Sequence, residues 1–253
     1  MDLGLRDRVF VLTGASKGLG YATAEALVAD GARVVVSSRS AEQVSAAVTR
    51  LGPLAHGVAA DLAAPATPEL LVGAATEQFG RFDGALISVG GPRLGSAASI
   101  DDADWRAAFE TVFLGTVRAA RVFAAALATR GGGAVGLVLS RSTREPVRGL
   151  GISNGFRPGL AGVAKDLSDE YGPSDVRFVG LLPGSILTDR NRQRFEATGD
   201  AERASADAVA EVPLRRLGEP AEFGRVAAFC LSPAASYLTG ITVPVDGGAL
   251  RGL

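Results

Sequence analysis

The stretch Thr13-Gly14-Ala15-Ser16-Lys17-Gly18-Leu19-Gly20 stands directly after the apolar run Arg8–Thr13. That run predicts a buried strand, and the residues from Gly18 to Asp30 predict a helix. Glycines at such a junction let the chain turn tightly and let backbone N–H groups approach a pyrophosphate at the helix N-terminus. Elsewhere the loop would be only a tight turn, but this placement predicts a dinucleotide-binding site.

The rest of the chain continues the alternation of short strand-like runs and longer helix-like stretches. Further strands are predicted at Arg33–Ser37, His56–Ala60, Gly84–Ser88, Ala134–Ser140, Val176–Leu182 and Ile241–Val245. Further helices are predicted at Ala41–Leu51, Pro68–Phe79, Asp104–Thr129, Leu150–Tyr171 and Pro220–Leu231. This order predicts an α/β protein: a single-domain Rossmann fold over residues 1–253, with a doubly wound parallel sheet of about seven strands and helices on both faces.

One long stretch, Pro183–Pro213, has no clear strand or helix pattern. It contains Asp189-Arg190-Asn191-Arg192-Gln193-Arg194, followed by a segment rich in Glu, Ala and Asp. Insertions that follow strand C-termini in such sheets usually cover a ligand site. We therefore predict a mobile helical flap at about residues 184–213.

Composition narrows the functional classes. The net charge of −1 argues against a general binder of nucleic acid or anionic membranes. Cys230 is the only cysteine and His56 the only histidine, so neither an intrachain disulfide nor a Cys/His metal cluster is expected. The N-terminus lacks an apolar signal core, and no apolar run approaches the roughly 20 residues that span a bilayer. We predict a cytoplasmic protein with no metal, nucleic-acid or membrane partner.

The end of the second predicted strand indicates which dinucleotide would bind. NAD-binding folds usually have an acidic residue there, which accepts a hydrogen bond from the ribose 2′-hydroxyl. This chain has Ser38 and Arg39 instead, and Lys17 in the glycine loop adds a second cation. Two cations without a carboxylate suit a 2′-phosphate, so NADP(H) is predicted in preference to NAD(H). A solvated surface charge is the alternative interpretation of Arg39.

Further motifs accompany the glycine loop, which has the pattern TGxxxGxG. They are Asp61-Leu62, Ser88-Val89-Gly90-Gly91, Pro183-Gly184-Ser185-Ile186-Leu187-Thr188, and Tyr237-Leu238-Thr239-Gly240 followed by Val245-Asp246-Gly247-Gly248. With these motifs the chain resembles the short-chain dehydrogenase/reductase family over essentially its whole length. The resemblance implies the cofactor-binding set Thr13, Gly14, Ser16, Lys17, Gly18, Leu19, Gly20, Ser38, Arg39, Asp61, Leu62, Val89, Gly90, Gly91, Arg157, Pro183, Gly184, Ile186 and Thr188.

The resemblance is weaker at the catalytic positions. The family uses an Asn, a Ser, a Tyr and a Lys, with Tyr as general acid/base and Lys lowering its pKa and binding ribose. Ser140 stands at the serine position, but the Tyr and Lys positions hold Ser153 and Arg157, and the Asn position falls on Val112. Loss of a positioned acid/base typically costs about 10²–10⁴-fold in rate.

The remaining residues offer substitutes only for part of this chemistry. Ser153 and Arg157 are four residues apart on one predicted helix and share a face. In our interpretation Ser140 polarises the substrate oxygen, Arg157 anchors ribose and supplies charge, and Ser153 positions a water. A convincing replacement for the general acid is not found among Tyr21, Tyr171, Tyr237 and the single histidine, although a neighbouring subunit could supply such a residue.

Arginines gather after the fifth and sixth predicted strands. The first group is Arg141, Arg144, Arg148 and Arg157, and the second is Arg190, Arg192 and Arg194. Because strand C-termini form the ligand face, we expect the two groups to face each other and hold a carboxylate, phosphate or carrier-linked acyl group. The candidate substrate residues are Arg144, Asn154 and Arg194. The alternative is solvated charges balanced by Glu196, Asp200 and Glu202.

These observations predict an NADP(H)-dependent oxidoreductase that acts on a small carbonyl or alcohol substrate. A catalytically silent NADP(H)-binding sensor or scaffold, and a lyase or isomerase on the same fold, remain as alternatives. The family's usual tetramer packs the helices that correspond to Asp104–Thr129 and Leu150–Tyr171, and the Ala-rich run Ala119–Ala128 would permit close approach. A homotetramer or homodimer is therefore expected.

Overall fold

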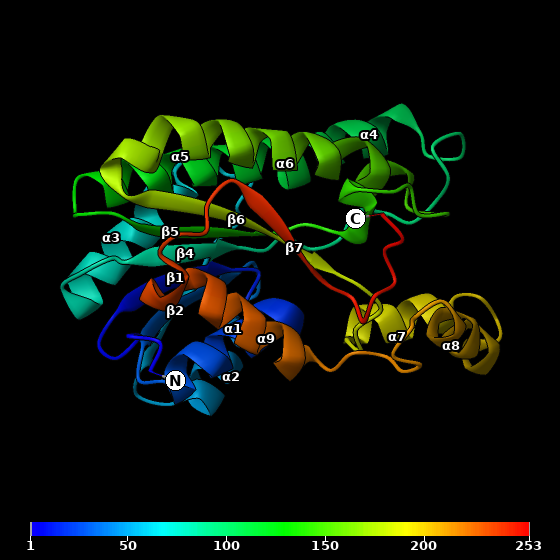
Figure 1. Cartoon of the computed structure of the whole chain (residues 1–253), viewed down its shortest axis with the longest axis horizontal. Coiled ribbons are helices and arrows are strands. Elements are labelled where there is room, and N and C mark those ends of the chain that lie inside the picture. Colours follow the sequence, from blue (N-terminus) through cyan, green and yellow to red (C-terminus); the bar gives the residue numbers. More distant parts are fainter. Residues whose placement is uncertain (1, 253) are drawn as a thin grey trace.

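One sheet of seven parallel strands forms the centre of the computed structural model, which describes residues 2–252 (Figure 1). The strand order is β3-β2-β1-β4-β5-β6-β7. Their bounds are β1 Val9–Thr13, β2 Arg33–Ser38, β3 Ala55–Ala59, β4 Gly84–Ile87, β5 Gly133–Val138, β6 Val176–Pro183 and β7 Ile241–Val245. The doubly wound parallel sheet predicted from the alternation is confirmed, with strand ends that differ from the predicted ones by one or two residues.

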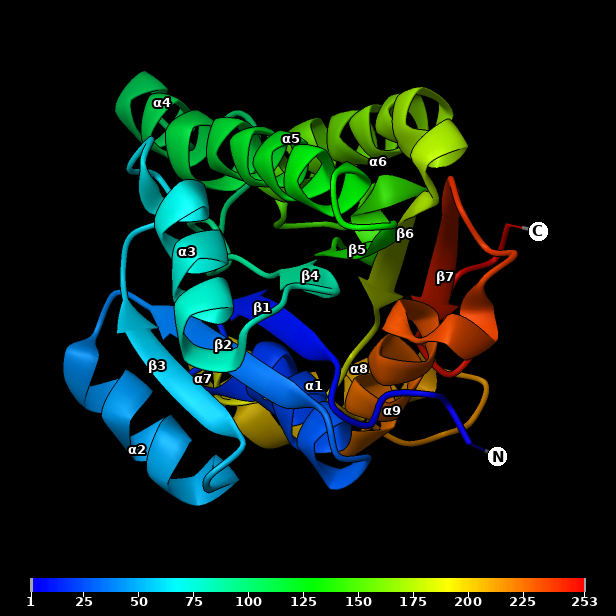
Figure 2. The ribbon, with the colours of Figure 1, turned by 90° about the vertical axis from the view of Figure 1, so that its left-hand side faces the viewer.

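Helices cover both faces of the sheet (Figures 1 and 2). On one face lie α1 (Gly18–Ala29), α2 (Ala41–Leu51) and α9 (Pro220–Leu231). On the other lie α3 (Thr67–Phe79), α5 (Gly115–Ala128) and α6 (Gly151–Tyr171). The central strands are buried on both sides, which explains why their sequences are nearly continuous apolar runs rather than alternating ones.

The predicted helix Asp104–Thr129 is longer and less regular than expected. It begins at α4 (Asp102–Ala108), where the side chain of Asp101 accepts a hydrogen bond from the N–H of Asp104. A π-helical segment, Phe109–Leu114, then widens the turn before α5 begins, and the N–H of Gly115 bonds to the carbonyl of Glu110. Such wider turns are frequent at functional sites because they re-aim side chains.

The stretch Asp102–Ala128 is, by length and composition, long and apolar enough to span a bilayer, which differs from the expectation from the sequence. Its α5 portion, however, contributes Ala119, Ala120, Phe123 and Leu127 to the core beneath the sheet. Their side chains are buried against the sheet, as in a helix of a protein core.

The predicted flap is helical. It contains α7 (Asp189–Glu196), capped by the side chain of Thr188, and α8 (Ala201–Ala210), capped by that of Asp200. Both helices extend beyond the carboxyl ends of the strands (Figure 1). That the flap is mobile stays a prediction.

The packing of α1 on α9 gives a first test of the core. A Cβ on Gly224 would lie 2.3 Å from the carbonyl oxygen of Ala22, so the helices touch through backbone. Gly224→Ala is expected to lower the free energy of unfolding by roughly 1–3 kcal/mol in urea titrations, because an added methyl forces the helices apart. Gly73→Ala on α3, where a Cβ meets nothing within 4 Å, is the control and should raise it by about 0.5–1 kcal/mol. Equal effects of the two changes would contradict this account.

Candidate dinucleotide and substrate site

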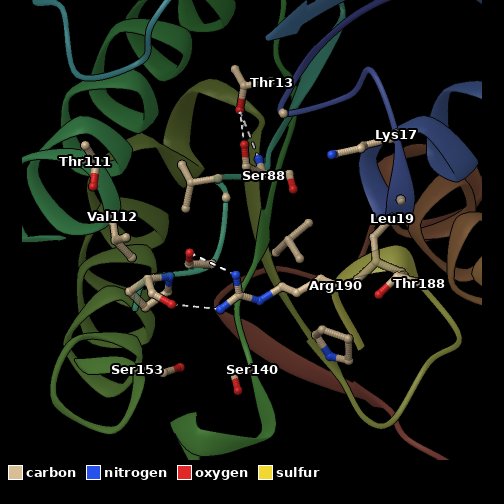
Figure 3. Close-up of a pocket in the computed structure, with 18 of the residues that line it drawn as sticks. Thr13, Lys17, Leu19, Ser88, Thr111, Val112, Ser140, Ser153, Thr188 and Arg190 are labelled. Atoms are coloured by element: carbon tan, nitrogen blue, oxygen red, sulfur yellow. Dashed lines mark hydrogen bonds between the residues drawn. The ribbon is translucent and has the colours of Figure 1, made fainter. Parts of the chain in front are cut away.

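A pocket of about 770 Å³ opens at the carboxyl ends of the strands. It lies over β1 and β4, the neighbours from which the strand order runs in opposite directions. Ligands of doubly wound sheets bind in the crevice at this point, and the volume falls within the range of about 300–1,000 Å³ for ligand pockets. Figure 3 shows side chains from distant parts of the chain converging there.

The glycine loop joins β1 to the N-terminus of α1 at this pocket. Gly14 has φ +55° and Gly18 φ +60°, in the left-handed region that favours glycine. A Cβ on Gly14 would also lie 2.5 Å from the carbonyl oxygen of Ser88. Thr13 Oγ1 donates to that carbonyl (2.8 Å) and accepts from the N–H of Ser88 (3.0 Å), which ties β1 to the end of β4. The loop therefore stays open to a phosphate at the positive end of the α1 dipole.

One end of the pocket has the polar groups that an adenosine phosphate would need. Lys17, Ser38 and Arg39 line it, and both cations are exposed. Ser38 Oγ is buried and has no hydrogen-bond partner within the described chain, which is costly unless a ligand or a water binds it. The carboxylate of Asp61 also lines this end and accepts from the N–H of Ala63 (3.0 Å). These residues fit a phosphorylated dinucleotide.

The other end of the pocket holds the hydroxyl groups of two serines. Ser140 follows β5, and its Oγ accepts from the N–H of Ser142 (3.1 Å), which leaves its own O–H free to donate. Ser153, in the first turn of α6, is buried and lies with its Oγ 2.9 Å from that of Ser142. Val112 of the π-helical segment is close by (Figure 3). Among residues 2–252, the lining includes no tyrosine, and its only lysine is Lys17.

Arg157 lies one turn beyond Ser153 and is a buried cation. One of its terminal nitrogens donates to the carbonyl of Val138 (2.9 Å), whereas its Nε has no partner in residues 2–252. Burial, with a smaller contribution from the nearby Arg190 guanidinium, lowers the pKa of Arg157 to about 10. Arg157 therefore remains charged near neutral pH and is a poor proton donor there, but it can bind a hydroxyl or an anion.

Arg190, near the N-terminus of α7, crosses the pocket. Its guanidinium donates to the carbonyls of Gly91 (3.0 Å) and Pro92 (2.8 Å) in the loop after β4. Figure 3 shows the side chain reaching from the side of Thr188 toward that of Val112 and Ser153. A Cβ on Gly91 would collide with the guanidinium, so glycine is required for this contact.

Most of the site residues predicted from the sequence line this one pocket. They are Thr13, Gly14, Ser16, Lys17, Gly18, Leu19, Ser38, Arg39, Asp61, Leu62, Val89, Gly90, Gly91, Ser140, Ser153, Arg157, Pro183, Gly184, Ile186, Thr188 and Arg194. Gly20 does not line it but packs beneath the loop, where a Cβ would lie 2.7 Å from the carbonyl oxygen of Gly14.

The structure does not bring two predicted substrate residues to the pocket. Arg144 extends to the edge of the sheet, where it donates to Thr242 Oγ1 and to the carbonyl of Thr242 (2.9 Å). Asn154 lies about 100° around α6 from Ser153, and its amide accepts from the N–H of Val147 (2.9 Å) and donates to its carbonyl (3.0 Å). Both side chains order loops, and their assignment to the substrate is corrected.

Sequence reasoning missed two contacts at the site. The pairing of Ser142 with Ser153 has no signal in the sequence, because a serine a few residues past a strand is common in turns. The bond between Arg190 and Gly91 joins residues 99 positions apart, and only the pair of glycines at positions 90 and 91 hinted at a close approach there.

The sheet, the glycine loop and the pocket together define a dinucleotide-binding α/β protein. A family model described as enoyl-(acyl carrier protein) reductase matches residues 14–249. An uncharacterised oxidoreductase of Mycobacterium tuberculosis is 36% identical over 249 residues, with 96% of this chain and 92% of that protein covered. Levodione reductase of Leifsonia aquatica is 33% identical over 257 residues, covering 96% and 94%.

Solved structures agree with these relatives. The L-sorbose reductase of Gluconobacter frateurii, complexed with NADPH and L-sorbose, superposes with a TM-score of 0.92 at 29% identity, and each chain is covered completely. The protein therefore belongs to the short-chain dehydrogenase/reductase family of oxidoreductases, as the sequence motifs predicted.

Proposed function

We propose that the protein is an NADP(H)-dependent oxidoreductase for a small carbonyl or alcohol substrate, with an active site that works without the family's Tyr–Lys pair. The observation that carries this proposal is the lining of the pocket at the end of β5. Ser140, Ser153 and Arg157 meet there, and no tyrosine belongs to the lining within residues 2–252. The structure of the L-sorbose reductase in complex with NADPH supports the choice of this cofactor.

Each of these side chains has a role that its surroundings support. Ser140 donates a hydrogen bond from its hydroxyl to the substrate oxygen and polarises it, since the N–H of Ser142 already engages one lone pair of the Ser140 oxygen. Arg157 binds the ribose hydroxyls and adds positive charge beside the reacting carbon. Ser153, held by Ser142, orients a water that exchanges the proton with solvent. When bound, NADP(H) supplies or accepts the hydride.

The direct test follows NADPH oxidation across ketones, aldehydes, quinones, imines and acyl thioesters. Ser140→Ala is expected to lower turnover of any active substrate by roughly 10²-fold, the size of losing one donor to a developing oxyanion. Ser45→Ala, an exposed serine on α2, is the control and should not change turnover. Tight NADPH binding without turnover on any compound would instead favour a sensor or scaffold.

The preference for NADP(H) is proposed to rest on Arg39 and Lys17. Arg39→Asp is expected to weaken NADPH binding by roughly 10²-fold, because a charge-assisted hydrogen bond is replaced by repulsion, and to leave NADH binding equal or tighter. Fluorescence titration with both cofactors measures this. Arg203→Asp on α8, outside the pocket lining, controls for net charge. An unchanged ratio of the two affinities would contradict the assignment of Arg39 to the 2′-phosphate.

We also propose that the protein forms a homotetramer or homodimer through α5 and α6, which light scattering would test. Phe109, the first residue of the π-helical segment that precedes α5, is 41% exposed and stacks on Phe113. An exposed apolar side chain close in sequence to the Ala-rich helix α5 suits a packed interface.

A further inference from the structure

Two arginines of the flap face the pocket from one side of the same short helix. Arg190 and Arg194 are four residues apart on α7 and both line the pocket, whereas Arg192 between them does not. Like charges at this spacing destabilise an isolated helix. The arrangement therefore requires compensation from outside the helix.

The chain supplies only part of that compensation. Arg141 pairs with Glu211 (3.0 Å) and Arg93 with Asp104. Arg190 bonds to two carbonyls, and Arg194 makes neither a hydrogen bond nor an ion pair with any described residue, although it is half-buried. Besides Arg39, five guanidinium groups thus line the pocket, those of Arg93, Arg141, Arg157, Arg190 and Arg194. The nearby carboxylates are those of Asp104, Asp189 and Glu211.

The pKa shifts of the two α7 arginines agree with an excess of positive charge in this pocket. Burial lowers the pKa of Arg194, and the neighbouring guanidinium groups of Arg141 and Arg190 lower it further, against the opposing effect of Glu211. Burial also lowers the pKa of Arg190. An anion bound between these side chains would relieve both the desolvation and the repulsion.

The lining of the same pocket also contains apolar side chains. They include Leu94, Val147 and Leu150, and Leu94 is 41% exposed. A ligand there would gain by covering these side chains. Arg194 is six residues beyond Thr188, the last residue of the Pro183–Thr188 motif, or about 9 Å along the helix.

We propose that the substrate is an organic carboxylate with an apolar body, whose carboxylate binds Arg190 and Arg194 while the body lies against Leu94, Val147 and Leu150. This inference rests on the proposed function, in which the carbonyl or alcohol at the other end of the substrate reacts beside Ser140, Ser153 and Arg157. Guanidinium groups bind carboxylates through paired, charge-assisted hydrogen bonds.

The test compares benzoate with its neutral isostere benzamide by calorimetry, on the protein with and without saturating NADPH. Wild type is expected to bind benzoate at least about 10-fold more tightly than benzamide, since a charged hydrogen bond contributes about 1.5–3 kcal/mol. Arg194→Gln should abolish this preference and leave NADPH affinity within about twofold. Arg192→Gln, on the same helix but outside the lining, should behave as wild type.

Equal binding of benzoate and benzamide to wild type, or an unchanged preference in Arg194→Gln, would overturn the proposal. Tighter binding of phenylphosphonate than of benzoate would overturn the choice of a carboxylate. The proposed function fails in a different way: the preference for benzoate over benzamide would persist while NADPH fails to bind, or while no carboxylic acid with a ketone or aldehyde at its far end is reduced.

Discussion

Arg157→Met is expected to raise the melting temperature of the ligand-free protein while lowering its turnover by roughly 10²-fold. A fall in pKa to about 10 corresponds to a penalty on the order of 3 kcal/mol for the buried charge. Methionine removes that penalty and fills similar space, but it leaves the carbonyl of Val138 without its donor. The net gain should be roughly 1 kcal/mol, or about 2–4 °C.

The pH dependence of this gain follows from the sign of the shift. Because the pKa of Arg157 is lowered in the folded state, the penalty is fully present at every pH below about 10. It is relieved only as the pH rises through that value toward the pKa of the unfolded chain. Calorimetry between about pH 6 and 9 should therefore show a constant difference between Arg157→Met and wild type.

Arg177→Met is the matched control. Arg177 is also partly buried with a pKa lowered by burial, but its guanidinium donates to the carbonyls of Cys230, Ser232 and Leu238. Its loss should lower the melting temperature, because three acceptors lose their donor. A lower melting temperature in Arg157→Met as well would show that its single hydrogen bond outweighs the cost of the charge.

The double change Ser153→Tyr with Arg157→Lys is expected to increase the rate of NADPH-dependent ketone reduction by about 10²–10⁴-fold. It places a phenol and an ammonium four residues apart on α6, on the face that lines the pocket beside Ser140. The phenol supplies the positioned proton donor that the proposed active site lacks. Steady-state rates on the compounds used for the Ser140→Ala comparison would measure the gain.

The double change Ser153→Phe with Arg157→Lys separates the effect of the phenol hydroxyl from the effect of placing a ring in the pocket. It adds the same ring and the same lysine without the acidic hydroxyl. Because it also removes the Ser153 hydroxyl that orients the water, its rate should fall below that of the wild type. If the tyrosine variant is no faster than the phenylalanine variant while both fold and bind NADPH, the wild-type site already contains its own acid. The proposed roles of Ser140, Ser153 and Arg157 would then be wrong.

The sequence by itself determined the fold and the glycine loop of the candidate site. Strand and helix order follow from hydrophobic periodicity, and the glycine loop follows from a turn that only glycine permits at Gly14 and Gly18. The spacing of Ser153 and Arg157 also places both on one helix face, and the structure has both lining the pocket. These are local properties, set by residues within a few positions of each other.

Only the tertiary structure decided which arginines reach the pocket. Arg144 and Arg194 are equally plausible from the sequence, yet Arg144 is held at the sheet edge by Thr242, 98 positions away. The bond from Arg190 to Gly91, the pairing of Ser142 with Ser153 and the π-helical turn at Phe109–Leu114 likewise lack a local pattern. The physical reason is that a long side chain can adopt many rotamers of similar energy, and the partner that selects one is supplied by a distant segment brought close by folding.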